Sequence, residues 1–423
     1  MWLHVIAALP ALLCFGAASL GERPPERPRD LSIASGSSVQ QHTERVLKRF
    51  STRGYGQDIT SPLTPDSHGN LFGTTEVGGL RFGTVYELSP NGQGGWTYTL
   101  VYAFKGGSDG GFPQFTPLIF DKSGNLYGTT GDGGANGFGV VFKLHHAGRG
   151  WVESALYSFL SFSGVYPFNS LIMDAAGNLY GTDNLYHDGG GITEAVYELK
   201  PSNGVWLASI VYDIGMPAAN GGGGGLVMDG AGHIFGISSG AFKPAIVFEL
   251  TQNGSGSWSA TTLYTFATVK LFPTGAPVLD KQGNIYGTTL GGGANRNGTV
   301  LKLIPGKSGP WQLKTLYAFK GGTSDGASPY AAVTFDAAGD IFGTTTFGGP
   351  SNAGTVYELV PSGARYDEQQ LWTFDGKDGM NSESSVALDS AGDIFGTTTA
   401  GGGNHQCYAK MGCGNAFEIT NSR

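Results

Sequence analysis

The stretch Asp121-Lys-Ser-Gly-Asn-Leu-Tyr-Gly-Thr-Thr130 decides the fold, because the chain repeats its frame seven times. In each copy an aspartate and a glycine frame a tight turn, and an aliphatic–aromatic pair then opens a short strand. The turn glycines of successive copies lie 51 to 56 residues apart, a period that predicts a propeller or another repeat array. The seven turn aspartates are Asp66, Asp121, Asp174, Asp229, Asp280, Asp336 and Asp389.

The composition agrees with an all-β chain. Glycine accounts for 72 of the 423 residues, aromatic residues for 12% and charged residues for only 14%. Few charges together with many Gly, Thr, Tyr and Phe residues are typical of short strands joined by tight turns. Because repeats that stack share one continuous core, we do not divide this length into several ordinary domains.

Each unit carries four strand signals. In the second copy they span residues 115–120, 125–130, 140–144 and 155–159, which is the pattern of one propeller blade. The last copy stops after its third strand, at 416–419, whereas 46–50 near the start matches the fourth-strand frame. We therefore predict a seven-bladed β-propeller with four-stranded blades, in which 44–50 pairs with 414–419 and closes the ring. A solenoid is the alternative, but it would not need a split repeat.

The start of the chain predicts export. Residues 1–21 read as a signal peptide, with an uncleaved anchor as the alternative, and 22–43 as a flexible leader before a propeller at 44–423. After signal removal we expect no membrane span and a secreted, extracellular or periplasmic location. In such a compartment Cys407 and Cys413 are disulfide candidates, and two free thiols are the alternative.

The repeated turn aspartates have a structural interpretation. An Asp side chain can accept hydrogen bonds from backbone N–H groups two or more residues further on, and the glycine suits the end of the turn. Calcium would need several oxygen ligands, but each turn offers one Asp and sometimes one Asn. We interpret these residues as turn formers.

A glycine also recurs inside every second strand, for example Gly128. Glycine weakens a strand, so its recurrence needs a cause, and we expect an aromatic side chain of the next blade to lie over it. Gly128→Val should then destabilise the fold by overpacking.

Three links between units share the frame Phe-Lys-Gly-Gly-x-Asp-Gly or a close variant, and they supply Asp109, Asp325 and Asp378. Loops on the rim of a propeller are the usual place for a ligand, so these aspartates are our ligand-binding candidates. Their carboxylates suit sugar hydroxyls or a cation. Turn formation explains them equally well.

The sequence predicts no catalytic, cofactor-binding or metal-binding residue. The eight histidines do not recur at one repeat position, and none has zinc-like spacing. No nucleophile elbow is present. The net charge of −8, without basic runs interleaved with aromatics, indicates no nucleic-acid partner, and we expect a monomer. The two catalytic carboxylates of a glycosidase can lie far apart in the sequence and leave no local motif, so an enzyme remains an alternative.

The frame Phe-x-Gly-x-Asp-Gly…Asp-x-x-Gly-Asn-Leu-Tyr-Gly-Thr-Thr…Gly-Gly…Gly-Thr-Val-Tyr-Glu-Leu resembles the GloVer tandem repeat, which occurs in exported bacterial proteins with a choice of C-terminal anchor. The resemblance covers 60–419, and the third and fourth copies depart most, with Thr182-Asp183 and Ile237-Ser238 in place of Thr-Thr. It implies export and repeat architecture, and it transfers no catalytic residue. Four residues follow Ile419, so we expect release rather than surface anchoring.

These observations favour an exported binding or scaffold protein that recognises a carbohydrate or a surface protein. An extracellular propeller enzyme of glycosidase or lyase type is the alternative. A structural disc without a ligand is a third possibility. A cluster of carboxylates or histidines near the ring axis would favour the enzyme.

Overall fold

The computed structural model describes residues 42–51, 59–114, 117–148, 150–159, 171–186, 192–217, 224–238, 243–254, 256–267, 273–307, 309–363, 365–403, 407 and 411–421. The predicted signal peptide and residues 22–41 of the predicted leader lie outside this part. His42–Arg423 forms one unit. Among the described residues, no helix has the length and apolar character needed to cross a membrane.

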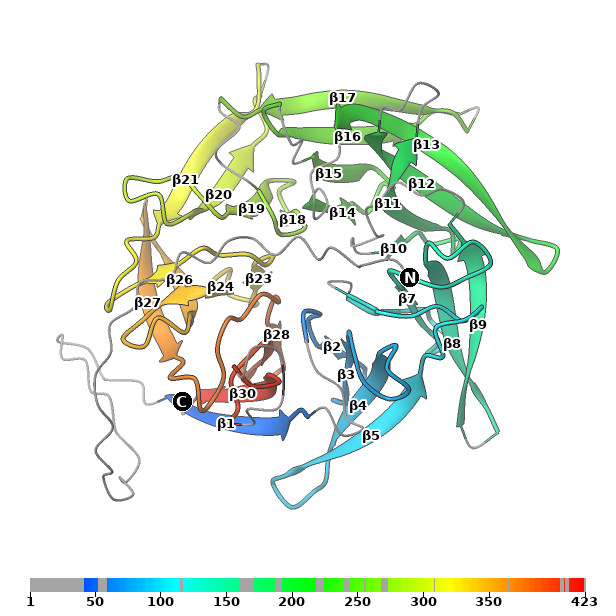
Figure 1. Cartoon of the computed structure of the whole chain (residues 1–423). Helices are drawn as coiled ribbons and strands as arrows, with labels where there is room; N and C mark the ends of the chain where they lie inside the picture. Colours follow the sequence, from blue (N-terminus) through cyan, green and yellow to red (C-terminus); the bar gives the residue numbers. More distant parts are fainter. Residues whose placement is uncertain are drawn as a thin grey trace, which may run out of the picture. The chain divides into compact units, whose positions relative to one another are not determined.

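Seven four-stranded antiparallel sheets stand as blades around one axis (Figure 1), so the chain is a seven-bladed β-propeller and the predicted fold class is confirmed. Blades 1 to 4 comprise β2 (Thr64–Pro65), β3 (Leu71–Thr75), β4 (Thr84–Pro90) and β5 (Trp96–Ala103); β6 (Ile119–Phe120), β7 (Leu126–Thr129), β8 (Val140–Ala147) and β9 (Gly150–Ser158); β10 (Ile172–Met173), β11 (Leu179–Tyr186), β12 (Ile192–Ser202) and β13 (Val205–Pro217); and β14 (Gly224–Met228), β15 (Ile234–Ser238), β16 (Ile246–Gln252) and β17 (Trp258–Thr265).

Blades 5 to 7 comprise β18 (Val278–Leu279), β19 (Ile285–Thr289), β20 (Thr299–Ile304) and β21 (Gln312–Ala318); β23 (Thr334–Phe335), β24 (Ile341–Thr345), β26 (Thr355–Ser362) and β27 (Arg365–Thr373); and β28 (Ala387–Leu388), β29 (Ile394–Thr398), β30 (Asn415–Asn421) and β1 (His42–Arg49). A small pair, β22 (Gly326–Ala327) with β25 (Phe347–Gly348), lies beside blade 6. The short first strand of each blade lies nearest the axis, and the fourth lies at the periphery (Figure 1).

The core lies between the blades. Phe72 and Val85 of blade 1 pack with Leu118, Leu126 and Phe142 of blade 2 in one buried cluster. Six further clusters follow around the ring. Because the third strand of each blade contributes to the packing on both of its faces, its sequence is more apolar than that of the outer strand.

The turn aspartates organise the hairpin between the first and second strands. Asp121 Oδ1 accepts the N–H groups of Ser123 (2.8 Å) and Asn125 (2.9 Å), and Oδ2 accepts the Asn125 side-chain amide (2.7 Å). Gly124 has φ +77°, which glycine adopts without strain. Burial raises the pKa of Asp121, but the hydrogen bonds outweigh it and hold the pKa below its ordinary value.

The glycine of the second strand lies under an aromatic ring, but this ring comes from the same blade. A Cβ atom built at Gly128 would lie 2.6 Å from Phe142 Cζ, and Phe142 is its cross-strand partner on β8. Tyr86, Tyr197, Phe248, Tyr357 and Phe417 cover the equivalent glycines. Our expectation of a ring from the next blade was therefore wrong, because antiparallel pairing brings the third-strand aromatic directly opposite the glycine.

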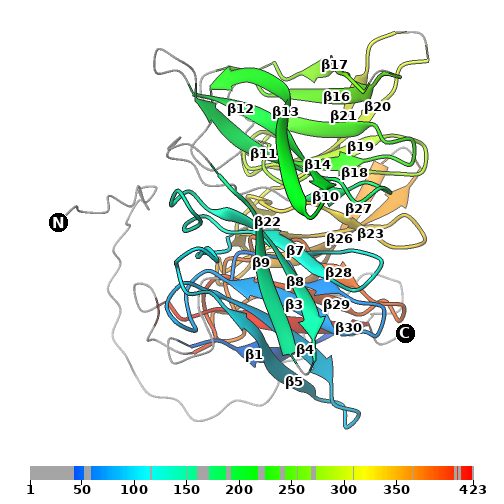
Figure 2. The same ribbon diagram turned by 90° about the vertical axis from the view of Figure 1, so that its right-hand side faces the viewer.

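Blade 7 combines strands from both ends of the described chain. β1 pairs antiparallel with β30, and the side view shows β29, β30 and β1 one beneath another (Figure 2). Phe50 occupies the place that Phe104 has at the end of β5, since each N–H donates to a glycine carbonyl that precedes the third strand, Gly414 and Gly83 respectively. Residues 42–50 thus take the position of a fourth strand.

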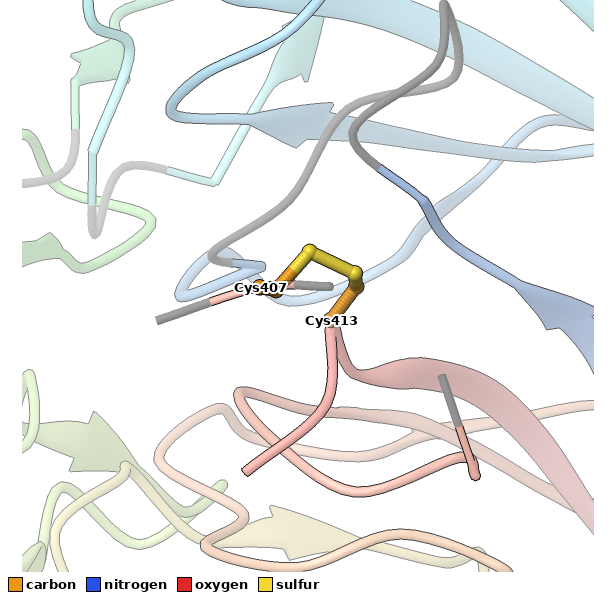
Figure 3. Close-up of a disulfide and its surroundings, with 2 residues drawn as sticks. All are labelled: Cys407 and Cys413. Carbon is orange, nitrogen blue, oxygen red and sulfur yellow. A yellow bond between two sulfur atoms is a disulfide. The ribbon is translucent and has the colours of Figure 1, made fainter. Parts of the chain in front are cut away.

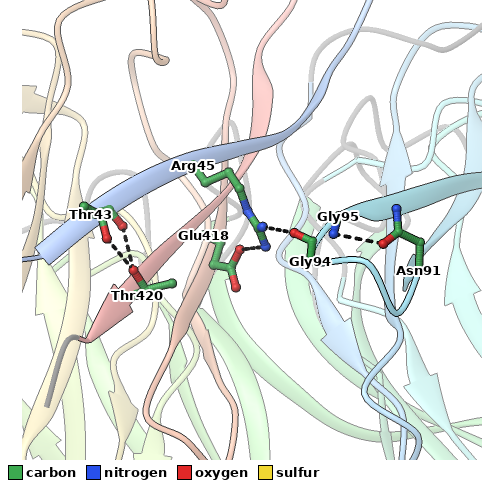
Figure 4. A network of polar contacts seen from close by, with 7 residues as sticks. All are labelled: Thr43, Arg45, Asn91, Gly94, Gly95, Glu418 and Thr420. Carbon is green, nitrogen blue, oxygen red and sulfur yellow. Dashed lines mark hydrogen bonds and ion pairs between the residues drawn. The ribbon is translucent and has the colours of Figure 1, made fainter. Parts of the chain in front are cut away.

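Arg45 of β1 also connects blade 7 to blade 1 (Figure 4). Its guanidinium forms an ion pair with Glu418 of β30 and donates to the carbonyl oxygen of Gly94 in the β4–β5 hairpin. At the inner edge of the same interface, Thr397 Oγ1 donates to the carbonyl oxygen of Ser61 at 3.1 Å. Blades 7 and 1 are therefore linked at both edges.

Candidate functional site

The three aspartates predicted as ligand contacts are bonded to their own chain. Asp109 Oδ2 accepts the Tyr102 hydroxyl (2.8 Å) and the Lys105 N–H group (3.0 Å). The equivalent donors are Tyr317 O–H (2.9 Å) and Lys320 N–H (2.7 Å) at Asp325, and Trp372 Nε1–H (2.9 Å) and Asp375 N–H (2.8 Å) at Asp378. Each aspartate thus fastens a link to the aromatic ring of the preceding outer strand. The structure does not bring the three together, since they belong to three different interfaces between blades.

The two cysteines form a disulfide in the loop between β29 and β30 (Figure 3), with Cα atoms 5.0 Å apart. Both are buried and pack in the cluster between blades 7 and 1, together with Phe50 and Ile59. The loop is thereby tied to the interface that the β1 strand completes.

A second group of residues lies closer to the axis. In each of four blades, one residue stands six positions before the turn aspartate, just ahead of the innermost strand: Thr60, Thr274, Tyr330 and Glu383. The same position in the other three blades, residues 115, 168 and 223, lies outside the described part. We call these the axial positions. Their chemistry differs from blade to blade.

Glu383 is an acid at an axial position. Its neighbours Ser382 and Ser384 are buried, and both bond to Thr397 of β29. Ser382 Oγ donates to the carbonyl oxygen of Thr397 at 2.8 Å, and the hydroxyls of Ser384 and Thr397 lie 2.7 Å apart. Because side chains alternate along an extended segment, the Glu383 carboxyl points away from β29. It has no hydrogen-bond or ion-pair partner among the described residues, and burial raises its pKa to about 7.

Tyr330 holds the equivalent position in blade 6. Burial, reinforced by the Glu383 charge, raises the pKa of Tyr330 to about 12. The Glu383 carboxyl therefore acts electrostatically on Tyr330 from the neighbouring blade. A carboxyl beside an aromatic ring offers a polar and an apolar contact to one ligand.

Tyr330 and Glu383 were not among the predicted site residues, because neither residue type recurs at this position of the repeat. Aligning the copies on the turn aspartate shows that this position holds Thr, Phe, Gly, Tyr or Glu, and its neighbours vary as well, so no sequence signal singles it out. In the part of the chain that the structure describes, no group of three or more His, Cys, Asp or Glu side chains could hold a metal ion.

Comparison with known proteins gives one family. The model of the Gloeobacter/Verrucomicrobia repeat matches residues 35–243 and 220–422. None of the curated proteins matches the chain.

Among solved structures, the chain resembles a protein of unknown function from Dyadobacter fermentans (14% identity, TM-score 0.44, 78% of this chain and 96% of that chain). It also resembles the PQQ-bound aldose sugar dehydrogenase of Streptomyces coelicolor (11%, 0.42, 90% and 99%) and the Aleuria aurantia lectin in complex with Fucα1-6GlcNAc (12%, 0.43, 75% and 96%). At these identities and TM-scores, none of the chemistry of those proteins transfers to this chain.

Proposed function

Since this chain belongs to the Gloeobacter/Verrucomicrobia repeat family and folds as a seven-bladed propeller, we propose that it is an exported binding protein for a carbohydrate, which it takes at Tyr330 and Glu383. The observation that carries the proposal is the Glu383 carboxyl, which is crowded by protein and has no partner among the described residues. Glu383 is half-buried and its oxygens are not among the fully buried atoms, so the carboxyl can accept hydrogen bonds from a ligand.

Carbohydrate chemistry fits this pair of residues. A sugar presents hydroxyl donors at its edge, which a carboxylate accepts, and C–H groups on its face, which pack on an aromatic ring. The other described axial residues, Thr60 and Thr274, carry hydroxyls that can donate as well as accept. A ligand with many hydroxyls can use all three kinds of contact at once.

Export rests on two further observations. The apolar stretch at 1–21 has the composition of a signal peptide. The disulfide between Cys407 and Cys413 suits an oxidising compartment. Determining the N-terminal residue of the protein secreted by a bacterial host tests this part, and an intact Met1 in the cell fraction would contradict it.

A glycan array with the purified chain, followed by calorimetry on the best ligand, tests the binding function. Glu383→Ala and Tyr330→Ala should each raise Kd by roughly tenfold or more, the cost of losing one charged hydrogen bond or one ring contact. Asp367→Asn on the outer strand β27 is the matched control, because Asp367 is exposed there. Affinities unchanged in both site variants would refute the proposed site.

The same samples distinguish binding from catalysis. Chromatography of each glycan after prolonged incubation should recover it intact. Release of shorter or unsaturated sugars would instead favour the glycosidase or lyase alternative. Paired carboxylates would then become the candidate catalytic residues.

A further inference from the structure

Three of the seven interfaces between blades contain an acidic pair that the repeat frame does not require. In each pair, the charge of the link aspartate that enters a blade acts on a glutamate on the outer strand of that same blade. The pairs are Asp109 with Glu153, Asp325 with Glu368, and Asp378 with Glu44, in blades 2, 6 and 7.

The three glutamates occupy one repeat position. Each stands opposite the same buried aliphatic residue of the third strand: Glu153 opposite Leu144, Glu368 opposite Leu359, and Glu44 opposite Ile419. In the other four blades this position holds Tyr98, Ala208, Ala260 and Leu313. The links that enter blades 3, 4 and 5 contain no acidic residue in the sequence. Among these six links, aspartate and glutamate occur together or not at all.

Two ionised carboxylates repel one another, so we would not expect them to occur as a pair unless one of the two carboxyl groups is protonated. Each aspartate accepts hydrogen bonds from an aromatic N–H or O–H group and from a backbone N–H group. At Asp378, burial and the neighbouring Asp375 also raise the pKa of the aspartate to about 6. One oxygen of each glutamate lacks such a donor: Oε1 of Glu44, Glu153 and Glu368 is buried, and in the described structure it has no hydrogen-bond partner. Glu368 differs from the other two in that its carboxyl also bonds to the Tyr317 hydroxyl. A protonated glutamate would supply the missing donor itself.

The groups that face each glutamate are of the same kind. They are Asp109, Lys105 and Tyr102 around Glu153; Asp325, Lys320, Tyr317 and Tyr357 around Glu368; and Asp378, Asp375 and Arg49 around Glu44. Each site therefore holds one anchored aspartate and one nearby cation, with a second acid only at Glu44. The cation limits the repulsion between the two acids but does not remove it.

We propose that the three acidic pairs are proton-operated latches, each of which fastens its link between blades when the glutamate is protonated and loosens it when the proton leaves. In the closed state the glutamic acid O–H donates to the aspartate carboxylate. In the open state that proton has passed to solvent, and two carboxylates face one another across the interface. No other atom or electron is transferred.

The physiological range is where the latches operate. Burial first, and the aspartate charge second, raise the pKa of Glu153 and of Glu368 to about 7 and that of Glu44 to about 8, from an ordinary value of 4.5. The folded chain therefore holds these protons more tightly than the unfolded chain. Stability from the latches is complete below pH 4.5 and is lost as the pH rises through 7 to 8.

Two latched links lead directly to the axial positions. Asp325 precedes Tyr330 by five residues, and Asp378 precedes Glu383 by five. Loosening a link would therefore release the backbone that positions an axial side chain. This consequence for ligand affinity rests on the proposed function, whereas the latch itself does not.

Hydrogen exchange measured by mass spectrometry from pH 5.5 to 8.5, corrected for intrinsic rates, tests the latch without a ligand. In the parent chain, the links 104–111, 319–327 and 374–380 should lose protection by at least roughly tenfold, the factor supplied by one unit of pKa difference. Replacing Glu44, Glu153 and Glu368 by Gln should abolish the pH response, because the neutral amide can donate at every pH. Asp367→Asn, beside Glu368 in the chain but exposed, should respond like the parent.

Glu153→Gln alone keeps the test decisive if the triple variant does not fold. It should flatten the response of 104–111 only, and leave 319–327 and 374–380 sensitive to pH. A parent without pH response at the three links, or a response that survives the Gln substitutions, would overturn the inference. Calorimetry across the same pH range then separates the two proposals, since a chain that binds no glycan at any pH refutes the function but leaves the exchange result intact.

Discussion

Substituting Gly128 by alanine is the most direct test of how the blades are built. Gly128 does not have a positive φ, so the backbone itself accepts an alanine. The added Cβ atom would lie 2.6 Å from Phe142 Cζ and 2.9 Å from Leu118 Cδ2, and both neighbours belong to a closely packed core. The perturbation is therefore steric, and Gly128→Val enlarges it.

The structure sets the size of the effect. Overpacking of a core costs about 1–3 kcal/mol, while the lower entropy of an unfolded chain with Ala in place of Gly returns about 0.4–1 kcal/mol. We expect Gly128→Ala to lower the free energy of unfolding by about 1–2 kcal/mol. The ring of Phe142 is fully buried, so it has little room in which to relax.

Blade 5 supplies the matched control. The residue opposite Gly287 is Leu301 instead of an aromatic, and the nearest atom to a new Cβ is Ile237 Cδ1 at an ordinary 3.4 Å. Gly287→Ala should therefore leave stability unchanged or raise it by up to about 1 kcal/mol. Guanidinium denaturation followed by tryptophan fluorescence measures both variants.

The aromatic ring of Phe142 also suggests a rescue experiment. Combining Gly128→Ala with Phe142→Leu reproduces the pair found in blade 5, and should cost less than the sum of the single changes. If Gly128→Ala and Gly287→Ala shift the midpoint equally, or if Phe142→Leu gives no rescue, contact with the aromatic ring does not explain the recurring glycine.

Three further results are expected. Tyr86→Phe should stabilise the fold by about 1 kcal/mol, because the buried Tyr86 hydroxyl has no partner among the described residues and the equivalent ring in blades 2, 4 and 7 is Phe; a lower denaturation midpoint would contradict this. Deleting 43–52 should lower the melting temperature and promote aggregation, because it removes Phe50 from the core and exposes the β30 edge, and a variant that melts like the parent would show that β1 does not close the ring. Replacing Cys407 and Cys413 by Ala should cost about 2 kcal/mol, the loop-closure value for so short a loop, and calorimetry without any change would speak against the bond in solution.

Much of this fold could be predicted because its information is local and repeated. The Asp-x-x-Gly turn needs only residues within one hairpin, so a side chain such as Asp121 and a glycine such as Gly124 identify it wherever they recur. The period of the copies then indicates a ring. Which ring lies over Gly128 depends on the register between β7 and β8, and the sequence pattern alone does not fix that register.

The candidate site was much less accessible to the sequence. Asp109, Asp325 and Asp378 attracted attention because they recur, but recurrence is typical of construction, and the structure places them in bonds to Tyr102, Tyr317 and Trp372. Tyr330 and Glu383 are 53 residues apart in the chain, and only the arrangement of blades 6 and 7 lets the Glu383 charge act on Tyr330.

By itself the sequence determined the number of blades, the strands within each blade and the turns that join them, since each depends on residues close together in the chain. Only the tertiary structure decided which charged groups act on one another, such as Asp109 on Glu153 and Glu383 on Tyr330. The physical reason is that burial and neighbouring charges, which set the protonation of a carboxyl, arise from whole blades packed together. From the sequence, a glutamate on an outer strand is expected to be exposed; burial and the charge of the link that enters its blade raise its pKa only in the folded ring.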